Sequence, residues 1–225
     1  MLYLFDIDGT LLLTGGAGTR AINRLFGDRY GVDGAMDGID PGGKTDPGIF
    51  TEIFVDRVGR EPEAGELDAL LDAYVPMLEA ELVDAPRFRI MPWAVECVRW
   101  LEGEGRVTLG IATGNVRAAA RAKLKRIDLH ETFAFGGFGC DSGDRAVLVA
   151  RAIERAAEHA GRSFPGDEVI VVGDTVRDID AARACGVRVL AVATGSTSRD
   201  DLAAAAPDAV FDTLEDLPSW HQSCR

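Results

Sequence analysis

The chain has 225 residues, of which 47% are hydrophobic, so it is long enough to bury a core of good size, with or without a smaller insertion. Acidic residues outnumber basic ones by 37 to 24, and the net charge of −13 argues against partners that are themselves polyanions, such as nucleic acid or an anionic membrane surface. A phosphorylated small molecule stays compatible with this charge where a divalent cation and a basic side chain are fixed beside it.

A short apolar segment, Leu2–Phe5, opens the chain and is followed at once by two carboxylates, Asp6 and Asp8. If the segment is a buried strand, both acids leave its carboxyl end, where open parallel sheets place their ligands. Burying two carboxylates side by side is unfavourable unless a cation or a proton relieves their repulsion, so a metal or proton chemistry is indicated. A solvated turn is the alternative, since strand ends are often rich in aspartate and glycine.

The stretch 15–88 shows helical periods and no convincing strand. Within it, Asp46 and Pro47 have the pattern of an N-cap followed by proline at the first helical position. About 70 residues are too many for a loop. We therefore expect a small helical cap domain over 15–88, inserted into a core domain made of residues 1–14 and 89–225, and covering the edge of the sheet where the two aspartates lie.

Beyond this stretch, short apolar runs alternate with helical periods. The runs are Val107–Ala112, Phe133–Phe135, Val169–Val172, Val187–Ala193 and Ala209–Phe211, of which the second and the last are the weakest. Alternating strands and helices predict an α/β fold, a doubly wound parallel sheet of the Rossmann-like type.

Polar groups follow two of these runs. Thr113, Gly114 and Asn115 come after one strand, and we expect Asn115 to cap the next helix, whose amino end favours anions. Asp174 and Asp178 come after another.

If the strands that carry them are central neighbours, Asp6, Asp8 and Asp174 converge on one point. Such an oxygen-only cluster suits Mg²⁺ better than zinc.

The order and spacing of these groups resemble the haloacid dehalogenase (HAD) superfamily of phosphatases and phosphotransferases over nearly the whole chain. The segment Asp6-x-Asp8-Gly9-Thr10 resembles motif I, Thr113 resembles motif II, and Gly173-Asp174-x-x-x-Asp178 resembles motif IV. The insertion is similar to the helical cap of the phosphoglycolate phosphatase and β-phosphoglucomutase branch.

Motif III departs from the usual pattern, which places a lysine at the start of the helix before motif IV. The matching position holds Arg145, which can bind a phosphoryl group and a carboxylate at once. A solvent-facing arginine is the alternative. Lys123 is a competing basic residue, but it falls in the middle of the helix after motif II.

The resemblance implies a role for each of these residues. Asp6 would be the nucleophile and Asp8 the acid and base, with Asp8 binding the metal through its backbone carbonyl. The expected Mg²⁺ ligands are Asp6, Asp8 and Asp174, the expected phosphoryl-binding groups are Thr113, Gly114, Asn115 and Arg145, and the expected supporting residues are Thr10 and Asp178.

The segment Gly38–Thr45 has the letters of a nucleotide-binding P-loop, but no buried strand precedes it and Pro41 removes an amide donor. The resemblance favours a cap loop that faces the active site. Lys44 and Thr45 would then contact the substrate, with a solvated lysine as the alternative.

The function expected is that of a Mg²⁺-dependent phosphatase, a HAD-type phosphoric monoester hydrolase that acts on a small metabolite such as phosphoglycolate through an aspartyl phosphate. A β-phosphoglucomutase-like sugar-phosphate mutase is the first alternative, because it would use the same aspartates. A non-catalytic binding domain on the same fold is the second.

The remaining sequence features concern the cell compartment. The chain has four cysteines, Cys97, Cys140, Cys185 and Cys224. They are widely spaced, so they indicate neither a zinc site nor a disulfide framework. No segment reaches the roughly 20 apolar residues of a membrane span. We expect a cytoplasmic protein that binds neither membrane nor nucleic acid; the sequence does not determine its oligomeric state.

Overall fold

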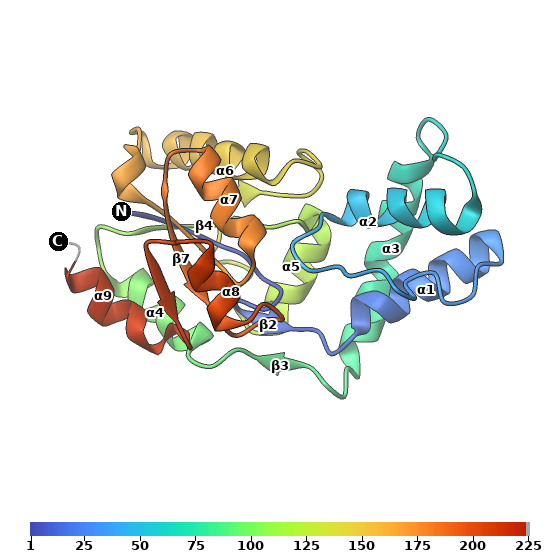
Figure 1. The fold of residues 1–225 in the computed structure, drawn as a ribbon, viewed down its shortest axis with the longest axis horizontal. Helices are drawn as coiled ribbons and strands as arrows, with labels where there is room; N and C mark the ends of the chain where they lie inside the picture. The colour runs from blue at the N-terminus through green and yellow to red at the C-terminus, as the bar shows by residue number, and fades with distance from the viewer. Residues whose placement is uncertain (224–225) are drawn as a thin grey trace.

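A computed structural model describes residues 1–223, so Cys224 lies outside the described residues. Its centre is a six-stranded sheet in which every neighbouring pair is parallel (Figure 1). The strand order is β5 (Gly136–Gly137), β4 (Thr108–Ala112), β1 (Leu2–Phe5), β6 (Val169–Gly173), β7 (Arg188–Val192) and β8 (Ala209–Phe211). The predicted doubly wound α/β fold is confirmed.

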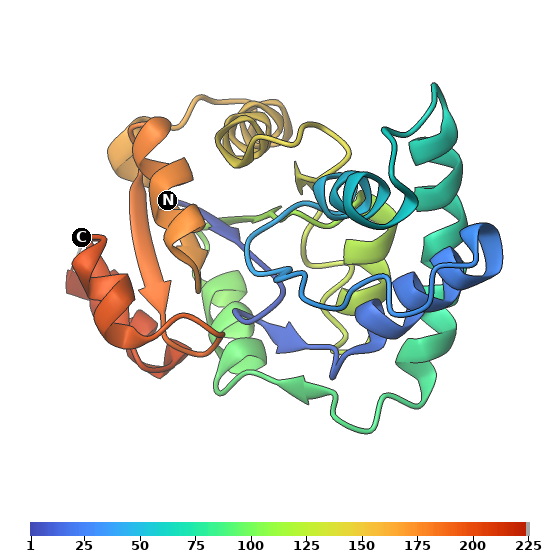
Figure 2. The ribbon, with the colours of Figure 1, turned by 45° about the vertical axis from the view of Figure 1, so that its right-hand side comes forward.

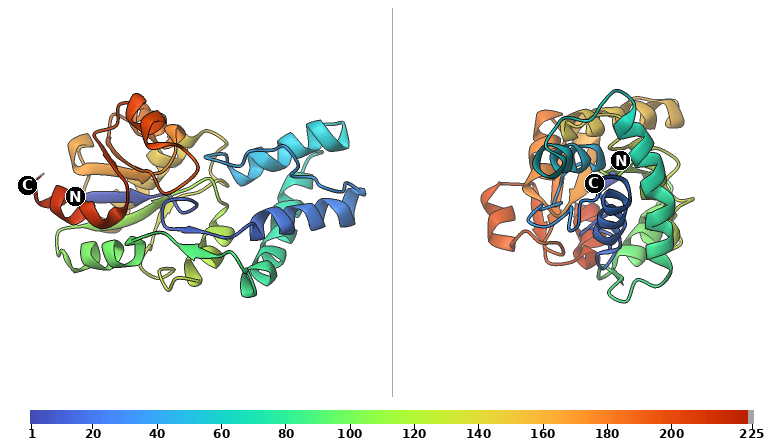
Figure 3. Two further views of the ribbon diagram at one scale, coloured as in Figure 1. Left: turned by 60° about the horizontal axis from the view of Figure 1, so that its bottom comes forward. Right: turned by 90° about the vertical axis from the view of Figure 1, so that its right-hand side faces the viewer.

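Side chains of the central strand β1 alternate between the two faces of the sheet, as a pleated strand requires. Tyr3 and Phe5 pack with helices α4 (Ala94–Gly103), α5 (Arg117–Lys125) and α9 (Leu217–Ser223). Leu2 and Leu4 pack with α6 (Arg145–Ala160), α7 (Val176–Ala184) and α8 (Arg199–Ala204). Figure 3 shows the two helical layers on opposite sides of the sheet, with α7 on one side and α4 on the other.

Three further helices form a third layer. They are α1 (Ala17–Tyr30), α2 (Asp46–Ile53), which continues into the π-helical turn Phe54–Val58, and α3 (Glu66–Val83). Their hydrophobic cluster also includes Val116, Ala119 and Ala122 at the start of α5 and within it. Figure 2 shows them beside the sheet, near α5, and the aromatic rings of Phe26 and Phe50 meet edge to face inside the cluster. The division of the chain at residues 15 and 88 stays a prediction.

The chain enters and leaves this helical layer through two short strands that pair with each other. Strand β2 (Leu12–Leu13) runs antiparallel to β3 (Arg89–Ile90) in a separate two-stranded sheet. The helical layer is thus joined to the parallel sheet by two adjacent segments of backbone.

Two local predictions were wrong. The weak run Phe133–Phe135 is not a strand; strand β5 is formed by Gly136–Gly137 instead. A Cβ on Gly137 would lie 1.8 Å from the carbonyl oxygen of Leu148, so α6 packs directly against this backbone and only glycine fits. The second error concerns the start of α2, where Thr45, not Asp46, is the N-cap and accepts a hydrogen bond from the Gly48 amide.

No helix within the described range 1–223 combines the length and the apolar character that crossing a membrane requires.

Candidate active site

Three neighbouring strands end at one edge of the sheet, and their following residues form the site. Phe5 pairs with Ile111 on one side and with Val172 on the other, so Asp6, Thr113 and Asp174 leave adjacent strands at nearly the same level. The predicted convergence of these strand ends is present.

The turn after Asp8 fits closely around Asp174. Gly9 has a φ of 89°, and a Cβ there would lie 2.3 Å from a carboxylate oxygen of Asp174, so the turn requires glycine. The hydroxyl of Thr10 donates a hydrogen bond to Asp174 Oδ1 at 3.0 Å. Thr10, expected as a supporting residue, therefore orients the Asp174 carboxylate.

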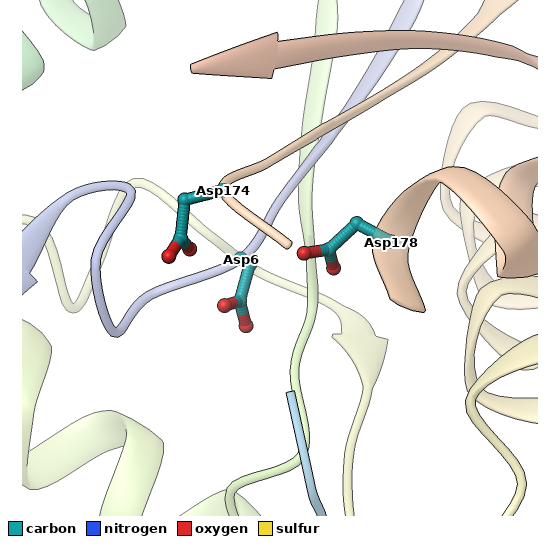
Figure 4. A group of neighbouring side chains, drawn as sticks. All are labelled: Asp6, Asp174 and Asp178. Carbon is teal, nitrogen blue, oxygen red and sulfur yellow. The ribbon is translucent and has the colours of Figure 1, made fainter. Parts of the chain in front are cut away.

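Three buried carboxylates cluster at this edge: Asp6, Asp174 and Asp178 (Figure 4). Each offers an oxygen within 4.8 Å of the others, and the Asp178 carboxylate points from α7 toward the other two. Burial raises the pKa of Asp6 to about 6, against the opposing effect of Arg145. Burial, and next the charge of Asp6, raise the pKa of Asp174 to about 8. This excess of buried negative charge, offered by oxygen atoms only, suits a divalent cation.

Arg145 joins the nucleophile candidate to Asp178. Its Nη2 lies 3.1 Å from Asp6 Oδ1 and 2.5 Å from Asp178 Oδ1, and its Nε donates to the same Asp178 oxygen at 2.8 Å. The other oxygen of Asp178 accepts hydrogen bonds from the amide and hydroxyl of Thr175, which forms a capping box at the start of α7. The Arg145 side chain is only 10% exposed, so it is a buried site residue and not a solvent-facing one.

Asp8 belongs to a second cluster. Lys123 Nζ lies 2.6 and 2.8 Å from its two carboxylate oxygens, and Asn115 Nδ2 donates to one of them at 2.7 Å. Asn115 also accepts from Lys123 at 2.6 Å and contacts the Thr113 hydroxyl at 2.8 Å. The Asp8 side chain is therefore directed to Lys123, and the third carboxylate of the acidic cluster comes from Asp178. Metal binding by the Asp8 backbone carbonyl stays a prediction.

Lys123 is the residue that the sequence analysis set aside. It lies three and four residues after Ala120 and Ala119, which are buried, so helical periodicity would have placed it on the inner face of α5. The prediction that Asn115 caps α5 was wrong: Val116 is the N-cap residue, and the Asn115 side chain turns to Asp8 and Lys123 instead.

The first residue of α2 connects the helical layer to this edge of the sheet. The Asp46 amide donates to the Gly114 carbonyl at 2.8 Å, and Asp46 Oδ2 accepts from the Val116 amide at 2.8 Å. A carboxylate from the helical layer thus accepts a hydrogen bond from the backbone amide at the amino end of α5. Burial raises the pKa of Asp46 to about 6, while Lys123 opposes the shift.

These groups line one cavity of about 970 Å³ between the sheet edge and the helical layer, with Asp6, Asp8, Thr113 and Arg145 among its lining residues. Lys44 also lines it, although its ammonium group is paired with Glu52 at 2.5 Å. The Gly38–Thr45 segment follows no strand, and Thr45 is not among the residues that line the cavity.

Comparison with known proteins matches residues 1–186 to the haloacid dehalogenase-like hydrolase family. The chain is 30% identical over 132 residues to the phosphoglycolate phosphatase of Synechococcus elongatus, an alignment that covers 59% of each protein. It is 24% identical over 222 residues to phosphoglycolate phosphatase 1 of Pseudomonas aeruginosa, covering 96% of this chain and 78% of that one.

In structure, it superimposes on a crystal structure described as a predicted phosphoglycolate phosphatase from Haemophilus somnus with a TM-score of 0.71 and 19% identity, covering 98% of this chain and 97% of the other. The fold and the family match agree with the expectation from the motifs. The chain belongs to the haloacid dehalogenase-like hydrolases.

Proposed function

We propose that this protein is a Mg²⁺-dependent phosphatase that hydrolyses the phosphomonoester of a small metabolite such as phosphoglycolate through a phosphorylated Asp6. The observation that supports this most directly is the position of the Asp6 carboxylate, which lines the cavity beside Arg145 and next to the buried acid Asp174. The relatives in Synechococcus and Pseudomonas are named phosphoglycolate phosphatases.

The first step transfers the phosphoryl group to Asp6. One carboxylate oxygen attacks phosphorus, the ester P–O bond breaks, and protonated Asp8 gives its proton to the departing oxygen. The Arg145 guanidinium and the Thr113 hydroxyl bind the phosphoryl oxygens, and Arg145 balances the negative charge that they carry.

The second step returns the enzyme to its starting state. Asp8, now ionised, removes a proton from water, the water oxygen attacks phosphorus, and the bond to Asp6 breaks to release inorganic phosphate. Because the Asp8 carboxylate is hydrogen-bonded to Lys123 and Asn115, two buried residues, the direction of the group that moves the proton is fixed.

The acidic cluster fits a divalent cation by its chemistry. Asp6 and Asp174 would hold the ion, with the Asp8 backbone carbonyl, and Asp178 would hold Arg145 in place beside it. When bound, Mg²⁺ supplies positive charge that offsets the buried carboxylates and the phosphoryl oxygens.

The helical layer limits the size of the substrate. The cavity of about 970 Å³ lies between α1, α2, α3 and the sheet edge, a volume in the range of small-molecule sites. This supports a small phosphorylated metabolite. A cytoplasmic location stays a prediction.

Phosphate release from a panel of phosphoglycolate, sugar phosphates, nucleotides and an aryl phosphate, with and without Mg²⁺, tests the proposal. We expect metal-dependent release that Asp6→Asn abolishes while its thermal unfolding stays cooperative. Isomerised sugar phosphate from β-glucose 1-phosphate and a bisphosphate primer would identify a mutase instead, and no turnover of any ester would identify a binding domain.

A further inference from the structure

The cavity is lined by a buried tyrosine hydroxyl that has no hydrogen-bond partner among residues 1–223. Tyr74 of α3 is 2% exposed and lines the cavity, yet its hydroxyl forms no hydrogen bond with any of residues 1–223. It is also not among the fully enclosed side-chain atoms that lack a partner, so it keeps access to the cavity. A hydroxyl on so deeply buried a side chain normally has a hydrogen-bond partner. A ligand bound in the cavity can be that partner.

The hydroxyl faces the amino end of α1. A Cβ built on Gly18 would lie 3.3 Å from the Tyr74 oxygen, and Gly16 and Gly18 line the same cavity. The N-cap position of α1 is Gly16, which offers no side chain to the first amides of this 14-residue helix. The hydroxyl donor and the positive end of a helix dipole therefore lie together.

Two arginines add positive charge to this end of the cavity. Arg87 and Arg89 line it, and within the described part of the chain the guanidinium group of neither forms a hydrogen bond or an ion pair. The backbone of Arg87 packs against Gly15, just before α1, because a Cβ on Gly15 would lie 2.3 Å from its carbonyl carbon.

The other cations of the cavity are already committed to carboxylates. Lys44 pairs with Glu52, Lys123 pairs with Asp8, and Arg145 pairs with Asp6 and Asp178. The charge available to a ligand outside the phosphoryl-binding groups is thus concentrated where α1 begins.

We infer that the cavity has a second subsite, which binds an anionic group on the leaving part of the substrate. It is formed by the Tyr74 hydroxyl, the amino end of α1, and Arg87 and Arg89. The inference rests on the proposed phosphatase function and narrows it to phosphomonoesters with a second negatively charged group. The Tyr74 hydroxyl is protonated at neutral pH and can donate, and burial, followed by the charges of Asp46 and Asp8, raises its pKa well above the ordinary value.

The test compares substrates that differ only in this charge. Phosphoglycolate and its amide, phosphoglycolamide, have the same size and the same scissile ester, but only the first has a carboxylate. We expect the wild-type protein to prefer phosphoglycolate in kcat/KM. In Tyr74→Phe, which keeps the ring packed against Phe50, this preference falls about tenfold, as loss of a hydrogen bond to a charged group predicts.

Matched variants separate recognition from stability. Tyr30→Phe removes a hydroxyl that bonds to Glu66 elsewhere in the same layer, and should leave the preference unchanged. Arg87→Gln combined with Arg89→Gln should lower the preference at least as much as Tyr74→Phe and mainly through KM. Arg24→Gln combined with Arg29→Gln, two residues of α1 that do not line the cavity, controls for the change of two charges.

The outcomes separate this inference from the function on which it rests. If no ester releases phosphate, the proposed function fails. If phosphoglycolate and its amide are turned over equally, or if Tyr74→Phe slows both by the same factor, the phosphatase assignment stands and the subsite does not exist. Ethylene glycol bisphosphate distinguishes the two anions: faster turnover than phosphoglycolate would identify a phosphate as the group bound there, and slower turnover a carboxylate.

Discussion

The ammonium group of Lys123 lies within 2.8 Å of both carboxylate oxygens of Asp8, and the Lys123 side chain is only 7% exposed. A buried cation with two contacts to Asp8, the residue proposed to move the proton, sets the direction of that carboxylate. Lys123 is therefore a positioning residue, in the core, for the chemistry proposed at Asp6.

Replacing Lys123 by methionine tests this role. We expect kcat for phosphate release to fall by about 10²-fold, within the range for losing general acid and base catalysis, with KM changed much less. Steady-state kinetics on an aryl phosphate give both constants. Lys123→Arg retains the charge and should recover part of kcat; if KM rises while kcat is unchanged, Lys123 binds substrate and does not position Asp8.

Removing the Asp178 carboxylate should affect both the site and the fold. Asp178→Asn weakens the contact with Arg145 and the capping box of α7 at once. We expect a loss of about 1 kcal/mol in the free energy of unfolding, typical of a lost helix cap, together with a drop in kcat/KM of more than tenfold. Urea denaturation and phosphate release measure the two effects. Ser198→Ala is the matched control, because Ser198 caps α8 away from the cavity; it should cost stability and leave activity intact.

The metal-free protein should lose stability as the pH rises. Asp6 and Asp174 have folded-state pKa values of about 6 and 8, above the ordinary value of 3.8, so the unfolded chain releases their protons first. The unfolded state is therefore favoured progressively between about pH 4 and pH 8, by about 1.4 kcal/mol for each unit of pKa shift as an upper bound. Thermal unfolding in EDTA at pH 5.5 and pH 8 should show the lower Tm at pH 8.

Added Mg²⁺ should reverse this trend, because the cation favours the ionised carboxylates. The increase in Tm should be largest at pH 8 and should be lost in Asp174→Asn. The same rise in Tm in this variant would mean that the ion binds elsewhere.

The contact between Asp46 and Val116 should stabilise the packing of the helical layer against α5. Asp46→Ala leaves the Val116 amide without its acceptor, so we expect a loss of about 1–3 kcal/mol in the free energy of unfolding. Asp46→Asn keeps a carbonyl acceptor at the same place and should lose less. Equal losses in urea denaturation of the two variants would show that charge, and not the hydrogen bond, accounts for the stability.

The parts of the site that the sequence predicted are those that local pattern determines. Asp6 and Asp174 directly follow buried apolar strands, and parallel strands bring their carboxyl ends to one edge whatever the rest of the chain does. Arg145 was predicted from the resemblance to motif III, and it is the first residue of α6.

What the sequence did not predict depends on which side chains meet across the fold. The direction of Asp8 toward Lys123 depends on the packing of α5, and the role of Asp46 as an acceptor for a helix 70 residues away depends on how the helical layer docks. Strand β5 was misplaced because the position of its glycines is set by the close approach of α6 and not by apolar periodicity.

The short ribbon of β2 and β3 has a mechanical consequence. Leu12 faces Ile90 and Leu13 faces Arg89, so the two connections to the helical layer are held in register and any swing of that layer must bend both together. Arg89 is part of this ribbon and also lines the cavity. A movement that widens the entrance to the cavity therefore shifts a guanidinium group as well, so that access for the substrate and the electrostatic attraction it meets on entering change in the same motion.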